Sequence, residues 1–279
     1  MKMPGTLFIV ATPLGNLEDI THRALRVLGE VDLIAAEDTR HSRKLLNHYG
    51  ITTPLTSYYD EIEARKAGEL VRELLAGRNL ALISDAGTPG IADPGFHLVR
   101  QAIDAGITVV PIPGPSALAA ALSVCGLPTD HVIFEGFLPA REGRRRRRLM
   151  EIQADPRTLV FYEAPHRARE TLADLLAVLG DRPAAVMREA TKIHETVTRG
   201  TLQALSAQAG DFERGEVTIV VAGAAAAAPI VPDDLDAQIA ALRAAGRRTR
   251  DIADELAAKY DLPRREVYRR IVGGAKREV

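Results

Sequence analysis

The chain has 279 residues, with 36 Lys and Arg against 37 Asp and Glu, a formal net charge of -1, 46% hydrophobic residues and one cysteine. This length predicts one large or two medium domains with a small appendage, and the composition excludes disordered and fibrous proteins. One cysteine cannot form an internal disulfide, and the apolar run Leu7–Thr12 is far too short to span a bilayer, so we expect a cytoplasmic protein without a membrane segment.

Short apolar runs alternate with helical patterns in residues 6–112. The runs are apolar almost throughout, which is typical of a parallel sheet covered by helices on both faces. The first is followed by a helix that Asp19 or Thr21 caps, and the last leads into an Ala-rich helix that begins near Ser116. We therefore predict an N-terminal α/β domain over residues 1–118. Its expected strands are Thr6–Thr12, Val31–Glu37, Asn79–Ser84 and Thr108–Ile112.

A second α/β domain is predicted over residues 119–226, because strand and helix patterns alternate there as well. The expected strands are His131–Phe137, Thr158–Glu163, Ala184–Glu189 and Glu216–Ala222, and the expected helices are Gly143–Gln153, His166–Leu179 and Thr201–Ala209.

A linker composition follows the second domain, in Ala224–Ala228 and the prolines just after it. Three helical patterns, starting at Leu235, Thr249 and Pro263, then predict a small C-terminal helical domain over residues 227–279. The last two patterns resemble a helix-turn-helix, and a plain three-helix packing unit fits them equally well.

The near-neutral total charge conceals two basic segments. Arg141–Arg148 holds six Arg and one Glu, and residues 243–279 hold eleven Lys and Arg against six Asp and Glu, so each carries +5 and the remainder carries -11. A charge run usually does no more than solvate a helix face, and the alternative is a patch that binds phosphates of a polyanion. His166 and Arg167 follow a strand and a proline, where they either grip phosphate or cap the next helix. The candidates for RNA binding are Arg144, Arg145, Arg146, Arg147, Arg148, His166 and Arg167.

Four segments follow the expected strands of the first domain, at the sheet edge where open α/β folds bind ligands. The richest, Asp85–Gly95, packs three glycines, two prolines and two aspartates into eleven residues. Glycines let the backbone approach a ligand, and prolines stiffen the loop. Neither GxGxxG nor GxxxxGK[ST] occurs, so a kinase or an NAD enzyme is disfavoured. The four segments are Thr12–Gly15, Glu37–Arg40, Asp85–Gly95 and Pro113–Ala117.

Seven blocks in chain order carry a family resemblance. The first four resemble the tetrapyrrole methylase superfamily of S-adenosylmethionine-dependent enzymes, and the last three are similar to its members that methylate ribosomal RNA. The resemblance implies two α/β domains with S-adenosylmethionine in the interdomain cleft, and a homodimer. It also implies 2'-O-methylation of a cytidine ribose in the decoding region of 16S ribosomal RNA of the small ribosomal subunit. The blocks are Leu7–Asn16, Ala36–Arg40, Ser84–Pro89, Pro113–Ala117, Phe134–Pro139, Phe161–Arg167 and Arg188–Lys192.

The same resemblance implies a set of cofactor-binding residues by position. The first loop contributes Pro13 and Gly15, and the second domain contributes Tyr162, Met187 and Thr218. The scattered histidines and Cys125 have no metal-ligand spacing, so no metal is expected. The other implied cofactor residues are Asp85, Gly87, Thr88, Pro89, Gly90, Ile91, Asp93, Ser116 and Ala117.

Alignment of the reacting atoms should dominate such a reaction, because a sulfonium methyl is already activated. Positioning contributes about 7–11 kcal/mol in well-oriented systems, whereas a general base contributes a factor of roughly 10²–10⁴. Glu189 and Lys192 follow an apolar strand where a cleft should open, so we predict that one of them contacts the ribose. The alternative is that this segment is a surface strand end with an ion pair and has no role in the reaction. The other candidates for a base or orienting group are Asp38, Glu163 and Glu195.

Two other functions remain open. The first is methylation of a tetrapyrrole precursor on the same fold, and the second is a non-enzymatic regulator that binds nucleic acid through the C-terminal helices. The Arg run, the block Phe134–Pro139 and the C-terminal helices favour RNA over a tetrapyrrole. About 220 residues of α/β domain with ligand loops argue against a regulator.

Overall fold

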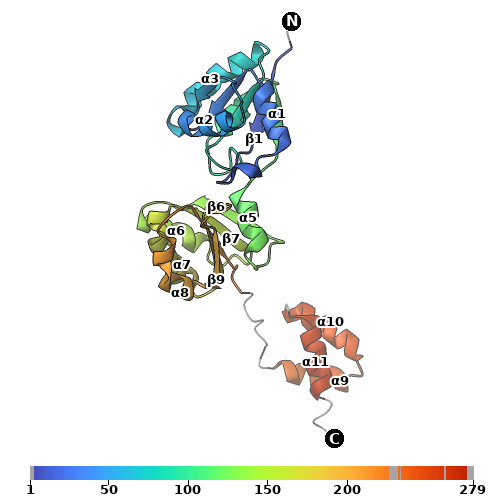
Figure 1. The fold of residues 1–279 in the computed structure, drawn as a ribbon. Helices are drawn as coiled ribbons and strands as arrows, with labels where there is room; N and C mark the ends of the chain where they lie inside the picture. The colour runs from blue at the N-terminus through green and yellow to red at the C-terminus, as the bar shows by residue number, and fades with distance from the viewer. Residues whose placement is uncertain (1–2, 226–231, 233, 261, 275–279) are drawn as a thin grey trace. The chain divides into compact units, whose positions relative to one another are not determined.

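The computed structural model describes residues 3–225, 232, 234–260 and 262–274. The chain divides into two compact units, Met1–Ala224 and Ala225–Val279. The first unit contains two five-stranded sheets with helices around each, and the second contains helices (Figure 1). The predicted fold class, two α/β sheets followed by a helical region, is confirmed.

The first sheet and its helices comprise β1 (Thr6–Val10), β2 (Leu33–Ala36), β3 (Leu55–Ser57), β4 (Leu80–Ile83), β5 (Thr108–Ile112), α1 (His22–Glu30), α2 (Thr39–His48), α3 (Asp60–Leu75) and α4 (Phe96–Asp104). All five strands are parallel, in the order β3-β2-β4-β1-β5. Leu80 and Leu82 pack with α3 and α4, whereas Ala81 and Ile83 point to the opposite face and pack with α1 and α2. Burial on both faces explains why the strands are apolar throughout.

Side-chain caps fix the starts of two helices, at the positions where the sequence predicts that these helices begin. Thr21 caps α1, because its Oγ1 accepts a hydrogen bond from the amide of Ala24 at 3.1 Å, and Asp19 ends the short 3-10 helix η1 (Leu17–Asp19). Ser116 caps the helix α5 (Ala117–Val124).

The second sheet and its other helices comprise β6 (Val132–Phe137), β7 (Thr158–Glu163), β8 (Pro183–Arg188), β9 (Thr196–Thr201), β10 (Val217–Val221), α6 (Glu142–Ile152), α7 (Ala168–Leu179), α8 (Leu202–Ala207) and the 3-10 helices η2 (Pro165–Arg167) and η3 (Ala209–Phe212). Its order is β6-β7-β10-β8-β9, with β6 and β7 parallel and the other pairs antiparallel. Phe161 packs with α6, α7 and α8 on one face, and Val160 packs with α5 on the other.

Two strands, β3 and β9, are missing from the sequence prediction. Each lies at an edge of its sheet, so neither needs apolar residues on both faces. The strand β3 has only three residues, and β9 is interrupted by Arg199 and Gly200. Short or polar edge strands leave no clear period in the sequence.

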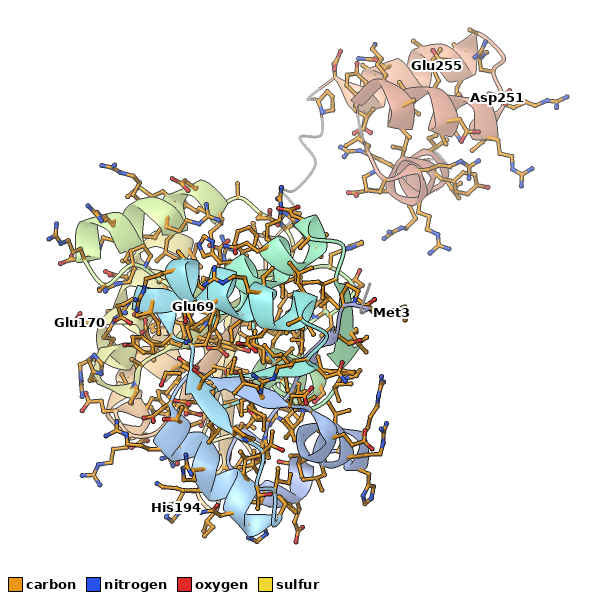
Figure 2. All side chains as sticks on the ribbon, turned by 90° about the horizontal axis from the view of Figure 1, so that it is seen from above. Met3, Glu69, Glu170, His194, Asp251 and Glu255 are labelled. Atoms are coloured by element: carbon orange, nitrogen blue, oxygen red, sulfur yellow. The ribbon has the colours of Figure 1, made fainter. Side chains whose placement is uncertain are left out.

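The C-terminal unit consists of α9 (Leu235–Ala244), α10 (Thr249–Tyr260) and α11 (Arg264–Gly274). A separate apolar core joins them, with Ile239, Leu256 and Ile271 buried, which suits both a helix-turn-helix and a plain three-helix unit. Asp251 and Glu255 project from α10 (Figure 2).

The expected linker, Ala224–Ala228, falls mostly outside the described residues, which omit 226–231 and 233. The three domain ranges 1–118, 119–226 and 227–279 stay predictions. In the described part of the chain, no helix combines the length and the apolarity that a membrane crossing requires.

Candidate active site

The loops that follow β1, β4 and β5 are tied together at one edge of the first sheet. Thr12 and Gly87 exchange backbone hydrogen bonds of 2.8 and 3.0 Å, and Thr12 Oγ1 donates to the carbonyl of Ser84 at 3.1 Å. Thr88 Oγ1 donates to the carbonyl of Pro115 at 3.2 Å. Carboxyl ends of parallel strands meet at one edge, so these loops form a single wall.

The opposite wall comes from β6, β7 and β10 of the second sheet. The Tyr162 hydroxyl accepts a hydrogen bond from the amide of Leu118 at 3.0 Å, and the Phe137 ring lies edge-on to Tyr162 with centroids 5.8 Å apart. The register of β6 against β7 shifts between Phe134 and Gly136, which marks a β-bulge. Gly136 has a φ of +62°, and a Cβ there would lie 3.4 Å from that of Ala92 in the loop of the first wall. The two walls therefore face each other closely.

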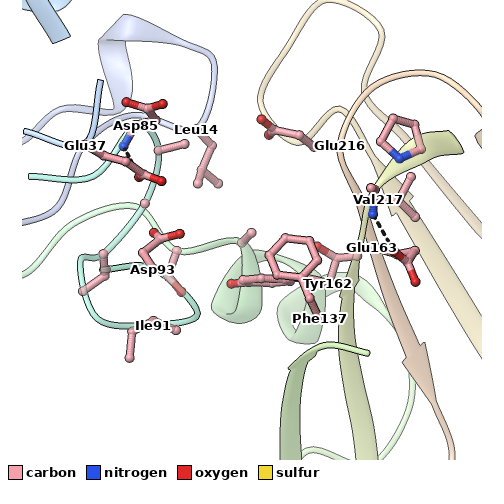
Figure 3. A pocket seen from close by; sticks show the side chains of 18 residues that line it. Leu14, Glu37, Asp85, Ile91, Asp93, Phe137, Tyr162, Glu163, Glu216 and Val217 are labelled. Carbon is pink, nitrogen blue, oxygen red and sulfur yellow. Dashed lines mark hydrogen bonds between the residues drawn. The ribbon is translucent and has the colours of Figure 1, made fainter. Parts of the chain in front are cut away.

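A cavity of about 350 Å³ lies between the two walls, and we call it the first cavity. Glu37 and Asp93 point into it from one wall, and Tyr162 and Glu216 from the other (Figure 3). Asp85 lines the same wall, and its Oδ1 accepts a hydrogen bond from the amide of Asp38 at 3.0 Å. Among the described residues, none that lines it is Lys, Arg or His. Its lining residues are Leu14, Glu37, Asp85, Ala86, Gly87, Thr88, Ile91, Asp93, Ser116, Ala117, Phe137, Tyr162, Glu163, Ala164, Pro165, Glu216, Val217 and Thr218.

Burial and mutual repulsion perturb the carboxylates of the first cavity. Burial, reinforced by the charges of Glu37 and Asp85, raises the pKa of Asp93 to about 7. Burial also raises the pKa of Glu37, although the amide of Asp85 donates to its Oε2 at 3.2 Å. Carboxylates held this close without a basic partner create a negative field, so the first cavity favours a cationic ligand.

We expect Asp93→Asn to change the pH dependence of stability. The folded-state pKa lies above the ordinary value near 4, so the stability contributed by protonated Asp93 is complete below about pH 4 and is lost as the pH rises through about 7. The variant should therefore lose less stability than the wild type between pH 5 and 8, by about 1–2 kcal/mol after allowance for solvent screening. Urea unfolding at both pH values without ligand measures this, and Asp130→Asn, at an exposed position, is the control. Equal pH dependence in all three proteins would contradict the expectation.

A second cavity, of about 550 Å³, adjoins the first and shares Leu14, Asp85, Ala86 and Glu216 with it. It lies between the loop after β1, the start of α2 and the segment after β8. Its lining includes three basic side chains, whereas that of the first includes none among the described residues. The residues that line the second cavity are Thr12, Pro13, Leu14, Gly15, Leu17, His41, Ser42, Lys44, Leu45, Ser84, Asp85, Ala86, Lys192 and Glu216.

Lys192 is held where the two cavities meet. Its Nζ lies 2.9 Å from Glu189 Oε1 and 3.4 Å from Glu216 Oε2. The side chain of Lys192 lies over Gly15. A Cβ at position 15 would come within 2.2 Å of Lys192 Cγ, so a larger residue there would displace the lysine side chain. The amide of Asn16 also donates to Thr191 Oγ1 at 3.2 Å. The segment after β8 is thus fastened to the loop after β1.

The ion pairs keep both Glu189 and Lys192 charged. The hydrogen bond from Lys192 lowers the pKa of Glu189, so Glu189 is a poor proton acceptor. Burial lowers the pKa of Lys192, but the hydrogen bond to Glu189 and the charge of Glu216 outweigh it and raise the pKa above its ordinary value. In this arrangement Lys192 acts as a fixed cation rather than as a general base.

The other candidates for a base or orienting group have structural partners. Glu163 borders the first cavity, but its side chain is fully buried and accepts hydrogen bonds from Thr171 Oγ1 at 2.5 Å and the amide of Ala164 at 2.8 Å. Asp38 caps α2 and pairs with Arg40, and its side chain lines neither cavity. Glu195 accepts from the amide of Thr191 at 2.5 Å.

The Arg run does not form one solvent-facing patch, which corrects the prediction for Arg145. Its side chain is 2% exposed, and its Nε lies 2.7 Å from Asp174 Oδ2, so it is a core residue of the second sheet rather than a phosphate ligand. Arg146 pairs with Asp174 and Arg148 with Glu135. Arg144 and Arg147 are exposed, and no carboxylate in the described residues pairs with either.

His166 and Arg167, in the 3-10 helix η2 after β7, also differ in their surroundings. Arg167 donates to the carbonyl of Leu138 at 2.8 Å and lies 3.3 Å from Glu163, so it holds the second domain together. His166 is exposed.

The structure brings most of the cofactor residues implied by the resemblance to the first cavity. Pro13 and Gly15 line the second cavity instead. Met187 is 4% exposed and packs in the core beneath α5, while Pro89 and Gly90 belong to the loop without lining either cavity. The residues that do line the first cavity are Asp85, Gly87, Thr88, Ile91, Asp93, Ser116, Ala117, Tyr162 and Thr218.

Sequence reasoning missed several residues of the two cavities. Leu14 and Glu37 stand inside the quoted blocks, so their position after a strand was an available signal. Phe137 is 53% exposed at the end of β6, and an exposed aromatic residue beside a cavity is visible only in the structure. His41 and Lys44 lie on a helix, where the rule for strand ends gives no signal. No cluster of three or more His, Cys, Asp or Glu among the described residues is placed to hold a metal ion.

Known structures share this architecture. The methyltransferase CobJ superposes with a TM-score of 0.61 at 19% identity, covering 79% of this chain and 95% of its own. The uroporphyrin-III C-methyltransferase from Thermus thermophilus, complexed with S-adenosyl homocysteine, superposes with a TM-score of 0.55 at 20% identity over 77% and 97%. The sequence profile of the Tetrapyrrole (Corrin/Porphyrin) Methylases matches residues 6–206. The fold and the cleft thus define a methyltransferase of the tetrapyrrole methylase type.

Closer relatives carry a more specific name. The protein named ribosomal RNA small subunit methyltransferase I from Pseudomonas aeruginosa is 56% identical over 78% of this chain and 79% of its own length. The protein of that name from Synechocystis is 46% identical over 95% and 96%. The chain belongs to the tetrapyrrole methylase family, within the group of ribosomal RNA small subunit methyltransferases I.

Proposed function

We propose that this methyltransferase transfers the methyl group of S-adenosylmethionine to a cytidine ribose 2'-hydroxyl in the decoding region of 16S ribosomal RNA. The relatives named for small-subunit ribosomal RNA support the substrate class. The observation that carries the proposal is the contrast between two adjoining cavities. The described lining of the first has carboxylates and no basic side chain, whereas that of the second adds His41, Lys44 and Lys192 to the shared Asp85 and Glu216. The first suits a cationic cofactor, and the second suits an anionic polymer.

The residues of the first cavity fit S-adenosylmethionine. Glu37, Asp85 and Asp93 would face its positive charges, and no basic side chain in the described lining offers a phosphate partner, which disfavours a phosphorylated cofactor. Ile91 and Phe137 offer apolar surface to a flat base. The hydroxyl groups that would hydrogen-bond the ligand belong to Thr88, Ser116, Tyr162 and Thr218.

The bound cofactor would supply an electrophilic methyl group on a sulfonium. The residues of this chain then need to bring the ribose hydroxyl into line with the methyl carbon and the sulfur. Lys192 lies where the cavities meet and stays charged, so it can fix an oxygen of the ribose by a charged hydrogen bond. A strong base is not required, because a hydroxyl proton can pass to water once the methyl transfer has begun. We further propose a homodimer and a cytoplasmic location, which follow from the family resemblance and from a ribosomal substrate.

Labelled S-adenosylmethionine offers the direct test of the substrate class. The purified protein is incubated with small ribosomal subunits from a strain that lacks this activity and, separately, with uroporphyrinogen III. We expect label in 16S ribosomal RNA and none in the tetrapyrrole. Label in the tetrapyrrole alone would support the alternative function and overturn the proposal.

The exposed arginines of α6 give a second test. We expect Arg144→Gln with Arg147→Gln to weaken binding of ribosomal RNA about tenfold and to lower the slope of log affinity against log salt by about 1–2, because each phosphate contact releases counterions. Affinity for S-adenosyl homocysteine should not change. The pair Arg26→Gln and Arg100→Gln, on helices of the first sheet, is the control. Equal salt slopes in both double variants would rule out this patch.

A further inference from the structure

The second cavity differs in charge from the cofactor cavity beside it. His41 and Lys44 enter it from α2 and Lys192 enters it from the segment after β8. Lys192 is paired with Glu189 and Glu216, whereas no carboxylate in the described residues lies within ion-pair distance of His41 or Lys44. Two basic side chains without an ion-pair partner, one helical turn apart on the same helix, suit a phosphate group. The carboxylates that line this cavity, Asp85 and Glu216, lie at its boundary with the first cavity.

Apolar side chains line part of the same cavity. Pro13, Leu17 and Leu45 offer apolar surface beside the basic residues. Ser42 also lines the cavity, but its Oγ exposes less than 1 Å², so a ligand there does not reach this hydroxyl. A flat heterocycle matches the apolar surface.

The position of the cavity relates it to the reaction. Asp85 and Glu216 line both cavities, so a ligand in the second cavity touches the boundary of the first. Lys192 lies at that boundary beside Glu216. At about 550 Å³ the second cavity falls within the roughly 300–1,000 Å³ that small-molecule sites occupy, which accommodates one nucleotide but not a duplex.

We propose that the second cavity binds one unstacked nucleotide of single-stranded RNA. His41 and Lys44 hold its phosphate, the apolar side chains contact its base, and the ribose faces Lys192. Enzymes that modify a nucleotide inside folded RNA take it out of the stack, and a pocket for one nucleotide provides for this. The inference rests on the proposed function and deepens it, because it identifies the part of the cleft that selects the nucleotide.

The phosphate contacts are tested with a short single-stranded RNA that contains one cytidine. Its affinity is measured by fluorescence anisotropy with S-adenosyl homocysteine present, for His41→Ala combined with Lys44→Ala and for the matched control Arg43→Ala. Arg43 is an exposed basic residue on the same helix that does not line the cavity. We expect a tenfold or greater loss of affinity in the double variant and less than a twofold change in the control. Equal affinities in both would overturn the proposal.

The proposed function and this inference fail in different ways. If the wild type transfers no methyl group to ribosomal RNA, the proposed function is wrong whatever the variants bind. If the wild type methylates the RNA, and the His41 and Lys44 double variant does so with an unchanged KM, the function stands and the nucleotide lies elsewhere.

Discussion

Lys192→Ala is expected to lower kcat/KM for methyl transfer by roughly 10²–10³, the cost of removing one preorganised charged donor from a reacting centre. The lysine is the cation at the boundary of the two cavities, and its loss leaves Glu189 and Glu216 without their shared partner. In the proposed mechanism, positioning by fixed charges is the main contribution that this chain makes to the reaction. Steady-state kinetics with small ribosomal subunits measure the effect.

Lys66→Ala is a matched control for this variant. Lys66 pairs with Glu69 three residues later at 2.7 Å and is 24% exposed, against 28% for Lys192, but it lies on α3 away from both cavities. Its removal should change kcat/KM less than twofold. Lys192→Arg should recover part of the activity, because the charge remains. Activity of Lys192→Ala within a few-fold of wild type, with the fold intact, would remove Lys192 from the reacting centre.

Arg145→Ala is expected to destabilise the protein by about 3–5 kcal/mol, because it leaves a buried carboxylate without its main partner. The guanidinium donates to Asp174 Oδ2 at 2.7 Å and to the carbonyl of Ala140 at 3.2 Å, and it lies 3.6 Å from the carboxylate of Glu170. Arg146 still contacts Asp174 in the variant, which places the effect toward the lower end of that range. Urea unfolding of the whole chain measures it.

Arg147→Ala on the same helix is the comparison for stability. Its side chain is exposed, so the urea midpoint should shift by less than about 0.5 kcal/mol in free energy. If Arg145→Ala unfolded like the wild type and bound RNA more weakly, the RNA-binding interpretation of Arg145 would return.

The layers of the fold could be predicted from the sequence because both faces of each central strand are buried. Strands such as β4, with four consecutive buried residues, have no polar face and read as continuous apolar runs. The edge strands β3 and β9 could not be predicted, since nothing covers their outer side and their residues are polar or few. The pairing order of the second sheet depends on contacts between residues far apart in the chain.

Site residues that come directly after a strand could be predicted from the sequence. Residues whose contacts depend on the direction of the side chain could not. The loop Asp85–Gly95 lies in the cleft because it follows β4. Arg145 shares a helical face with Leu149 and Ile152, at spacings of four and seven residues, so periodicity indicated its burial even within a run of arginines. The pairing of Glu163 with Thr171 and Arg167, in contrast, arises only when η2 and α7 fold against β7.

The chemical form of the methylated nucleotide tests the account most directly. Small-subunit RNA is methylated by the wild-type protein, digested to nucleosides and analysed by mass spectrometry. The proposed function predicts 2'-O-methylcytidine as the product. A cytidine methylated on its base, or methylation of another nucleoside, would contradict it.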